Sequence, residues 1–151
     1  MLAVFLLAAS LAQAPAIAPH YVSQRTDKAY LREGPGYAYR VLWIYRHKGM
    51  PFQESAAYDV WRRVAAPDGA VGWMSQEMLS DSRTVLVTGK TRVAIRKDMD
   101  AGAKVIGLAD PGAVMKLKTC VSDACRVASG DTDGWIPKAD LWGVAASEVF
   151  K

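Results

Sequence analysis

The side chains that could act as a general base near neutral pH are two histidines, His20 and His47. A catalytic nucleophile needs such a base within hydrogen-bond reach, and neither histidine lies in a motif that would place one there. The chain has no G-x-S-x-G, H-E-x-x-H or Walker motif, and no G-x-G-x-x-G that follows a strand. We therefore expect a protein that is not an enzyme and that uses no cofactor.

The two cysteines, Cys120 and Cys125, are the other candidates for chemistry. Four residues separate them, and Asp123 suits a tight turn, so they would face each other across a hairpin at a distance that a disulfide accepts. The competing interpretations are a metal site and a redox-active pair. Two thiols and two histidines make a poor zinc site, and the spacing is not C-x-x-C. We expect a structural disulfide that contributes roughly 2 kcal/mol, and no metal site.

The elements that position these residues occur twice, because the sequence repeats itself. The distance between matching residues falls from 64 to 62 along the chain, a drift that changes in loop length explain. The repeat predicts two domains, residues 20–83 and 84–147. The matching segments are Leu31-Arg32 with Ile95-Arg96, Trp61-Arg-Arg63-Val64 with Ala124-Cys-Arg126-Val127, and Gly72-Trp73-Met74 with Gly134-Trp135-Ile136.

Each copy consists of short segments typical of β-strands, separated by turn residues. In the first copy, residues 28–32, 39–46, 61–65 and 70–74 are predicted strands, and Gly34-Pro35-Gly36 and Pro67-Asp68-Gly69 are predicted turns. Residues 75–79 and 137–141 fit a single 3₁₀ turn each. The sequence predicts an all-β fold of two small barrels in tandem.

The order of these elements resembles the bacterial SH3-like family in its exported, tandem form. The resemblance rests on Leu31-Arg32, Gly34-Pro35-Gly36, Trp61-x-Arg63-Val64, Gly72-Trp73 and a closing Leu79, and it covers about residues 26–143. In the second copy, Asp98-Met99-Asp100 replaces Gly-Pro-Gly and Ala124 replaces Trp61. The resemblance implies two five- or six-stranded barrels and a non-enzymatic recognition role, often towards peptidoglycan.

Aromatic residues of the first copy are candidates for a binding surface. Ten of the 14 Phe, Trp and Tyr residues lie between Tyr21 and Trp73. Two copies of one fold need similar cores, so part of this surplus should be exposed. The predicted ligand-binding residues, which would stack on sugars or apolar peptide or pair with carboxylates, are Tyr37, Tyr39, Arg40, Trp43, Tyr45 and Trp61.

The alternation of side chains along residues 41–46 does not decide which face of this predicted strand is buried. If Leu42 and Ile44 face the barrel interior, Trp43, Tyr45 and His47 form an outward aromatic row. The alternative is that Trp43 and Tyr45 pack in the core or between the barrels.

The charge distribution limits the partners. The formal charge of +4 is divided evenly between the two halves, and no basic block resembles a nucleic-acid-binding arm. We expect no nucleic acid partner. The expected partner is peptidoglycan, bound by the first barrel, and the alternative is an envelope protein for which the chain serves as an adaptor.

The N-terminal segment indicates export. Residues 1–16 carry no charged side chain and end in small residues, a pattern typical of a signal peptide cleaved before Ile17. The segment lacks a basic start, so an uncleaved N-terminal anchor is the alternative. We expect a periplasmic or secreted protein with no transmembrane segment in the mature chain.

Overall fold

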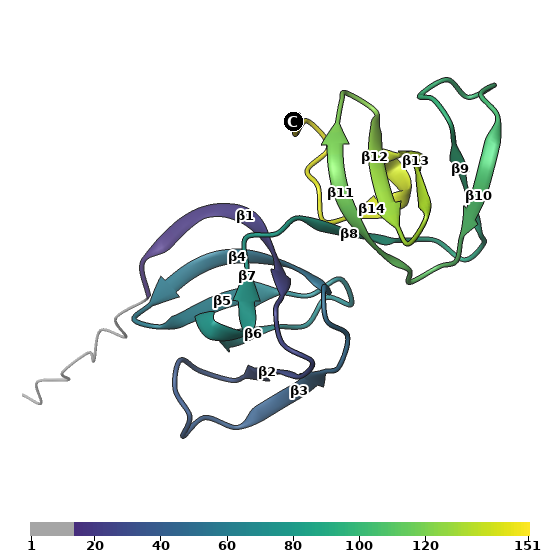
Figure 1. Cartoon of the computed structure of the whole chain (residues 1–151). Coiled ribbons are helices and arrows are strands. Elements are labelled where there is room, and N and C mark those ends of the chain that lie inside the picture. The colour runs from purple at the N-terminus through teal and green to yellow at the C-terminus, as the bar shows by residue number, and fades with distance from the viewer. Residues whose placement is uncertain (1–13) are drawn as a thin grey trace, which may run out of the picture.

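The computed structural model describes residues 14–151, so most of the predicted signal peptide, residues 1–13 of 1–16, lies outside the described residues. The described chain forms two lobes, each built on one antiparallel seven-stranded sheet (Figure 1). No helix among these residues is long and apolar enough to cross a membrane. The predicted all-β, two-domain architecture is confirmed.

The first domain contains the strands β1 to β7 and one 3₁₀ turn. Their order in the sheet is β3-β2-β6-β5-β4-β1-β7. The elements are β1 (Ala16–Gln24), β2 (Ala29–Arg32), β3 (Val41–Tyr45), β4 (Pro51–Tyr58), β5 (Trp61–Ala65), β6 (Val71–Ser75), η1 (Gln76–Met78) and β7 (Leu79–Ser80).

The second domain repeats this order strand by strand, as β10-β9-β13-β12-β11-β8-β14. Each sheet has seven strands, one more than the upper number that the resemblance implied, when the two-residue strand after each 3₁₀ turn is included. The elements are β8 (Thr84–Val87), β9 (Val93–Arg96), β10 (Val105–Ala109), β11 (Val114–Cys120), β12 (Ala124–Ser129), β13 (Thr132–Pro137), η2 (Lys138–Asp140) and β14 (Leu141–Trp142).

The repeated Gly-Trp pair has a steric cause. A Cβ atom on Gly72 would lie 2.6 Å from the carbonyl oxygen of Arg32, and one on Gly134 would lie 2.6 Å from that of Arg96. Only glycine lets β2 and β9 approach the neighbouring strand this closely. The equivalent close approach in both domains explains why this part of the repeat is the best preserved.

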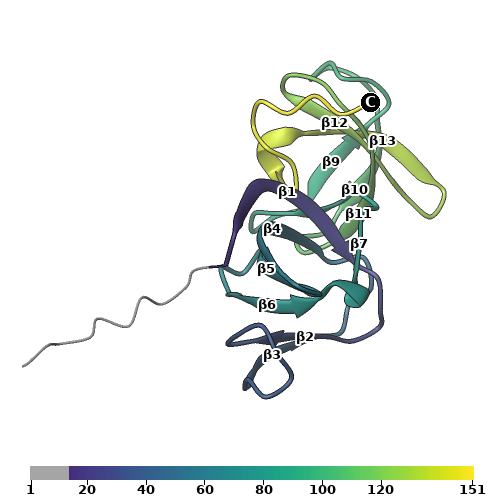
Figure 2. The ribbon, with the colours of Figure 1, turned by 90° about the vertical axis from the view of Figure 1, so that its left-hand side faces the viewer.

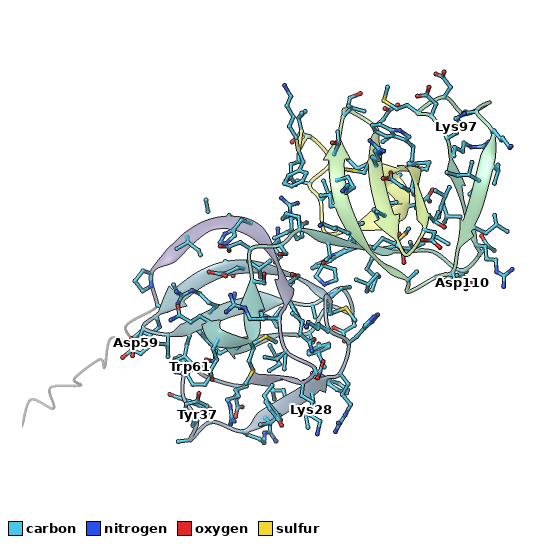
Figure 3. The ribbon with its side chains drawn as sticks, in the orientation of Figure 1. Lys28, Tyr37, Asp59, Trp61, Lys97 and Asp110 are labelled. Carbon is cyan, nitrogen blue, oxygen red and sulfur yellow. A yellow bond between two sulfur atoms is a disulfide. The ribbon has the colours of Figure 1, made fainter. Side chains whose placement is uncertain are left out.

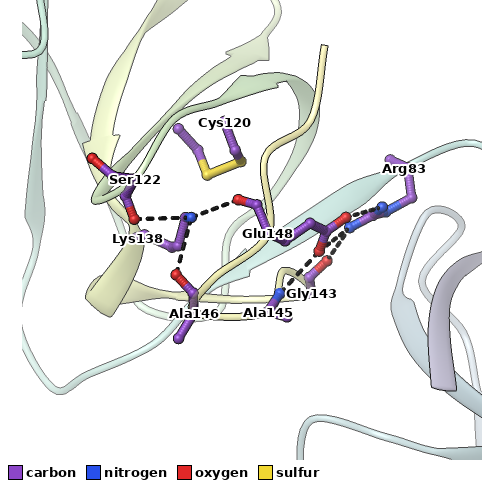
Figure 4. The surroundings of a disulfide bond; sticks show 9 residues. Arg83, Cys120, Ser122, Lys138, Gly143, Ala145, Ala146 and Glu148 are labelled. Carbon is purple, nitrogen blue, oxygen red and sulfur yellow. Dashed lines mark hydrogen bonds and ion pairs between the residues drawn. A yellow bond between two sulfur atoms is a disulfide. The ribbon is translucent and has the colours of Figure 1, made fainter.

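The predicted disulfide is present in the hairpin of β11 and β12. Cys120 and Cys125 face each other in the strand register, and both are fully buried. Lys138 lies beside this hairpin, and its ammonium group donates hydrogen bonds to the carbonyl oxygens of Ser122, Ala146 and Glu148 at 3.1, 3.2 and 2.7 Å (Figure 4). These bonds hold the C-terminal segment against the second domain.

Arg83 lies where the two domains meet. Its guanidinium group donates to both carboxylate oxygens of Glu148, at 2.6 and 3.2 Å, and to the carbonyl oxygen of Gly143 at 2.9 Å. The same group lies 5.5 Å from the ring centre of Tyr21 in β1, which Figure 2 shows at the junction of the lobes. The ring of Tyr21 also meets that of Trp142 edge-on at 5.3 Å. The junction is thus built from an ion pair and aromatic contacts.

Candidate functional site

The predicted residues Tyr37 and Trp61 are in contact. Their rings meet edge-on, with centroids 4.9 Å apart, and Figure 3 shows both at one end of the first domain. Tyr37 is exposed, whereas Trp61 is only 6% exposed. The Tyr37 hydroxyl donates to Glu77 Oε1 at 3.3 Å, and the Arg32 guanidinium lies 5.3 Å from the Tyr37 ring centre. Trp61 therefore offers little open surface, and the exposed Tyr37 ring packs against it.

Tyr39 and Arg40 lie in the loop between β2 and β3. The Tyr39 ring lies so close to Gly34 that a Cβ there would come within 2.4 Å of it. This contact explains the Gly-Pro-Gly turn of the first copy. Arg40 is exposed, and its side chain lies 3.8 Å from a carboxylate oxygen of Glu33. Both predicted residues are accessible to solvent.

An outward aromatic row on β3 requires Leu42 and Ile44 to face the barrel interior, and this prediction is wrong. Trp43 pairs with Leu31 and Tyr45 with Ala29, so both rings lie on the face of these buried residues. Leu42 and Ile44 are on the other face and exposed. Because β3 is the last strand of the sheet, Trp43 remains 59% exposed on the inner face.

Tyr45 is held by two contacts. Its ring meets the fully buried Phe52 edge-on at 5.1 Å, and its hydroxyl lies 3.2 Å from Asp68 Oδ2. Burial, with the Asp68 carboxylate, raises the pKa of Tyr45. Tyr45 thus packs against the core of the first domain, whereas Tyr37, Tyr39, Arg40 and Trp43 are exposed.

A polar cleft that the sequence did not indicate lies in the same domain. It has a volume of about 490 Å³ and is lined by the side chains of β1, β4, β5 and the η1 region. At its base, Glu54 is 6% exposed and its Oε1 lies 3.2 Å from Arg62 Nε. His20 Nε2 lies 3.8 Å from the other oxygen of Glu54. The lining residues are His20, Val22, Arg25, Glu54, Arg62, Gln76, Glu77, Leu79, Ser80 and Asp81.

The charges of this cleft are fixed in position. Arg62 donates to the carbonyl oxygen of Asp59 at 2.7 Å and to Gln76 Oε1 at 2.7 Å. Burial raises the pKa of Glu54, although the charges of His20 and Arg62 oppose that shift. The cleft therefore presents a carboxylate and a guanidinium group side by side in a partly desolvated site, where each interacts strongly with a charged ligand.

The second domain has no such ion pair at these positions. In the strand register, Glu54 lies opposite Val64, and Leu117 lies opposite the equivalent Val127. Likewise, Arg62 lies opposite Met74, and Cys125 lies opposite the equivalent Ile136. Leu117 and Cys125 are therefore the counterparts of Glu54 and Arg62. Leu117 and Cys125 are both buried. The repeat offset of 63 residues would have revealed this exchange of charged for apolar residues.

Within residues 14–151, no three His, Cys, Asp or Glu side chains are placed to hold a metal ion. Paired opposite charges line the cleft at Glu54.

Comparison with known proteins gives three results. A family model described as the bacterial SH3 domain matches residues 25–81 and, again, residues 89–143. No curated protein matches the sequence.

Two solved structures from Trichomonas vaginalis are similar in outline. NlpC2 is 11% identical over 83% of this chain and 48% of its own, with a TM-score of 0.38. NlpC1 is 14% identical over 93% of this chain and 50% of its own, with a TM-score of 0.38. The present chain thus spans about half the length of each.

Proposed function

The chain belongs to the bacterial SH3 domain family, as two domains in tandem, and from this premise we propose that it is a non-catalytic module that binds peptidoglycan outside the cytoplasm. The binding site is the polar cleft of the first domain. The first domain is thus the proposed binding domain, and its site lies at Glu54, Arg62 and their neighbours and not at the predicted aromatic residues.

The observation that supports this function is the ion pair of the buried Glu54 with the half-buried Arg62. Burying charges costs free energy that their mutual attraction often only offsets, and apolar replacements are commonly as stable. The second domain has Leu117 and the disulfide-bonded Cys125 in these places, so the same fold forms there without the charges. Their presence beside an open cleft favours a role in ligand recognition.

The chemistry of the cleft fits the peptide part of peptidoglycan. Short peptides in the wall carry carboxylate groups, and amino groups where they are not cross-linked. Two cations of the cleft, Arg25 and Arg62, suit the peptide carboxylates. Its acidic residues suit the amino groups; they are Glu54, Glu77 and Asp81. The hydroxyl of Tyr37 donates a hydrogen bond to Glu77, which lines the cleft. The exposed ring of Tyr37 therefore lies next to the cleft, where it could contact a sugar or an apolar group.

The location outside the cytoplasm is supported by the disulfide. Structural disulfides form and persist in oxidising compartments such as the periplasm. Together with the predicted signal peptide, Cys120 and Cys125 favour a periplasmic or secreted protein.

The test is co-sedimentation of the chain from Ala14 onward with purified peptidoglycan sacculi, at low and at physiological salt. We expect retention that survives physiological salt, and its loss in E54L/R62M, which gives the cleft the apolar character of the second domain. The matched control is R126Q/D133N, which removes an exposed ion pair of the second domain and should bind as the wild type does. Retention of E54L/R62M equal to that of the wild type would refute this site. Retention lost with salt in every variant would indicate only a basic protein on an acidic polymer.

A second candidate function, an adaptor for an envelope protein, is favoured by β3. This strand lies at the free edge of its sheet with Leu42, Trp43 and Ile44 exposed. Exposed apolar edge strands are suited to pairing with an extended partner segment. If sacculi do not bind, cross-linking from position 43 in the periplasm should capture one defined protein, and an I44K variant should abolish that product.

A further inference from the structure

The second domain contains a hollow of about 450 Å³ beside the loop between β9 and β10. Lys97, labelled in Figure 3, marks the start of this loop. The hollow lies apart from the cleft proposed above. Its main lining residues are Arg96, Asp98, Asp100, Asp123, Ala124 and Trp135.

The first domain has two aromatic rings in the equivalent place. The loop after β2 is closed by a hydrogen bond from Glu33 N to Arg40 O, and the loop after β9 by one from Lys97 N to Lys104 O, so Tyr37 corresponds to Ala101. Trp61 pairs with Ser75 as Ala124 pairs with Pro137.

The two rings that contact each other in the first domain are thus both replaced by methyl groups in the second. Ala101 and Ala124 line the hollow that results. The volume that the Tyr37 and Trp61 rings fill in one domain is open in the other.

Three carboxylates accompany this opening. Asp98, Asp100 and Asp123 line the hollow, and the corresponding residues of the first domain are Gly34, Gly36 and Val60, none of which is charged. The lining also contains one cation, Arg96, whose guanidinium group donates to the carbonyl oxygen of Ala103 at 2.8 Å. The lining therefore has an excess of negative charge around an aromatic wall.

We propose that this hollow is a second binding site, which takes an organic cation on an apolar stem, such as a lysine-type ammonium or an arginine-type guanidinium group. The stem would occupy the volume that the two rings fill in the first domain, against Trp135 and Met99. The cation would lie among the carboxylates, with the face of an aromatic ring as a further favourable contact. This site is independent of the cleft at Glu54.

The test uses small probes of defined charge. Nα-acetyl-lysine methylamide and Nα-acetyl-arginine methylamide are titrated against the ¹⁵N-labelled chain, with the indole N–H signal of Trp135 as the readout. The neutral probe Nα-acetyl-norleucine methylamide is the control. We expect the two cationic probes to shift this signal and the neutral probe to bind at least about tenfold more weakly.

Two variants keep the proposal falsifiable. A101Y/A124W rebuilds in the second domain the ring pair of the first, and it should abolish the response while other backbone signals keep their positions. D98N/D100N/D123N keeps the shape and removes the charge, so it should weaken cation binding at least about tenfold. Equal binding of the norleucine probe, or an undiminished response in both variants, would overturn the proposal.

A further experiment distinguishes a cell-wall amino group from a protein side chain as the source of the cation. Native sacculi and sacculi with acetylated amino groups are compared, each with the wild type and A101Y/A124W. A difference between the two proteins on native sacculi alone assigns the cation to the cell wall. No difference on either, with lysine and arginine probes still bound, assigns it to a protein side chain. Because E54L/R62M leaves this hollow intact, failure of the first site and of the second are distinguishable.

Discussion

Glu54 and Arg62 in the first domain hold the backbone positions that Leu117 and Cys125 hold in the second. One fold thus accepts a buried ion pair or two apolar side chains at the same place. The cost of the ion pair depends on both partners being present, because each charge compensates the desolvation of the other.

Removing one partner should therefore harm the protein more than removing both. We expect R62M to lower the free energy of unfolding by about 2–4 kcal/mol, since Glu54 is left buried without its main partner. E54L/R62M should return to within about 1 kcal/mol of the wild type or exceed it. Urea unfolding followed by fluorescence measures both, and a double variant as unstable as R62M would contradict the argument.

Glu54 should also make stability depend on pH. Burial raises its pKa in the folded state, so the folded protein binds a proton more readily than the unfolded chain. Its favourable contribution is present below the ordinary glutamate pKa and is lost as pH rises through the raised value. E54Q should therefore lose less stability than the wild type as pH rises above the ordinary glutamate pKa of about 4. Parallel wild-type and E54Q curves over this range would rule the effect out.

Glu148 should act in the opposite sense. Burial alone would raise its pKa, but hydrogen bonds from Arg83 and from the Ala145 N–H lower it. Its contribution is present above the ordinary glutamate pKa and is lost as pH falls through the lowered value. The difference in unfolding free energy between the wild type and E148Q should be largest near neutral pH and shrink below about pH 4. A difference that stays constant with pH would refute this role.

The disulfide closes a small loop, so its contribution should be modest. We expect C120A/C125A to lower the free energy of unfolding by about 2 kcal/mol and to keep the fold. Circular dichroism and urea unfolding measure the two effects. A loss above about 5 kcal/mol, or an unfolded variant, would show that the bond does more than close the hairpin.

The sequence predicts the fold well, because the pattern of strands and turns occurs twice and the two copies can be compared. Gly72 and Gly134 mark the same close approach of strands, and the spacing of Cys120 and Cys125 is that of a hairpin. The faces of β3 were not predictable, since Leu42, Trp43 and Ile44 are all apolar and an edge strand leaves both faces exposed. Alternation carries no information where both sets of residues are apolar.

The candidate sites depend on contacts between distant segments, which local patterns do not contain. Glu54 is a single acidic residue in β4, and its partners Arg62 and His20 come from β5 and β1. Likewise, the ring of Trp61 in β5 packs against Tyr37, which lies in the loop between β2 and β3. The exchange of both rings for alanine in the second domain has meaning only once that contact is known.

Arg83 connects the two domains and the C-terminal segment through Glu148, Gly143 and the rings of Tyr21 and Phe150. A lobe that swings away from its neighbour must break the contacts of the Tyr21 ring with Arg83 and with Trp142. These contacts favour one spacing of the two proposed sites. Once one site has bound a polymer of repeating units, the other site meets its own unit at a high effective concentration. Two weak sites then give strong overall binding where the repeat of the polymer matches the spacing of the sites.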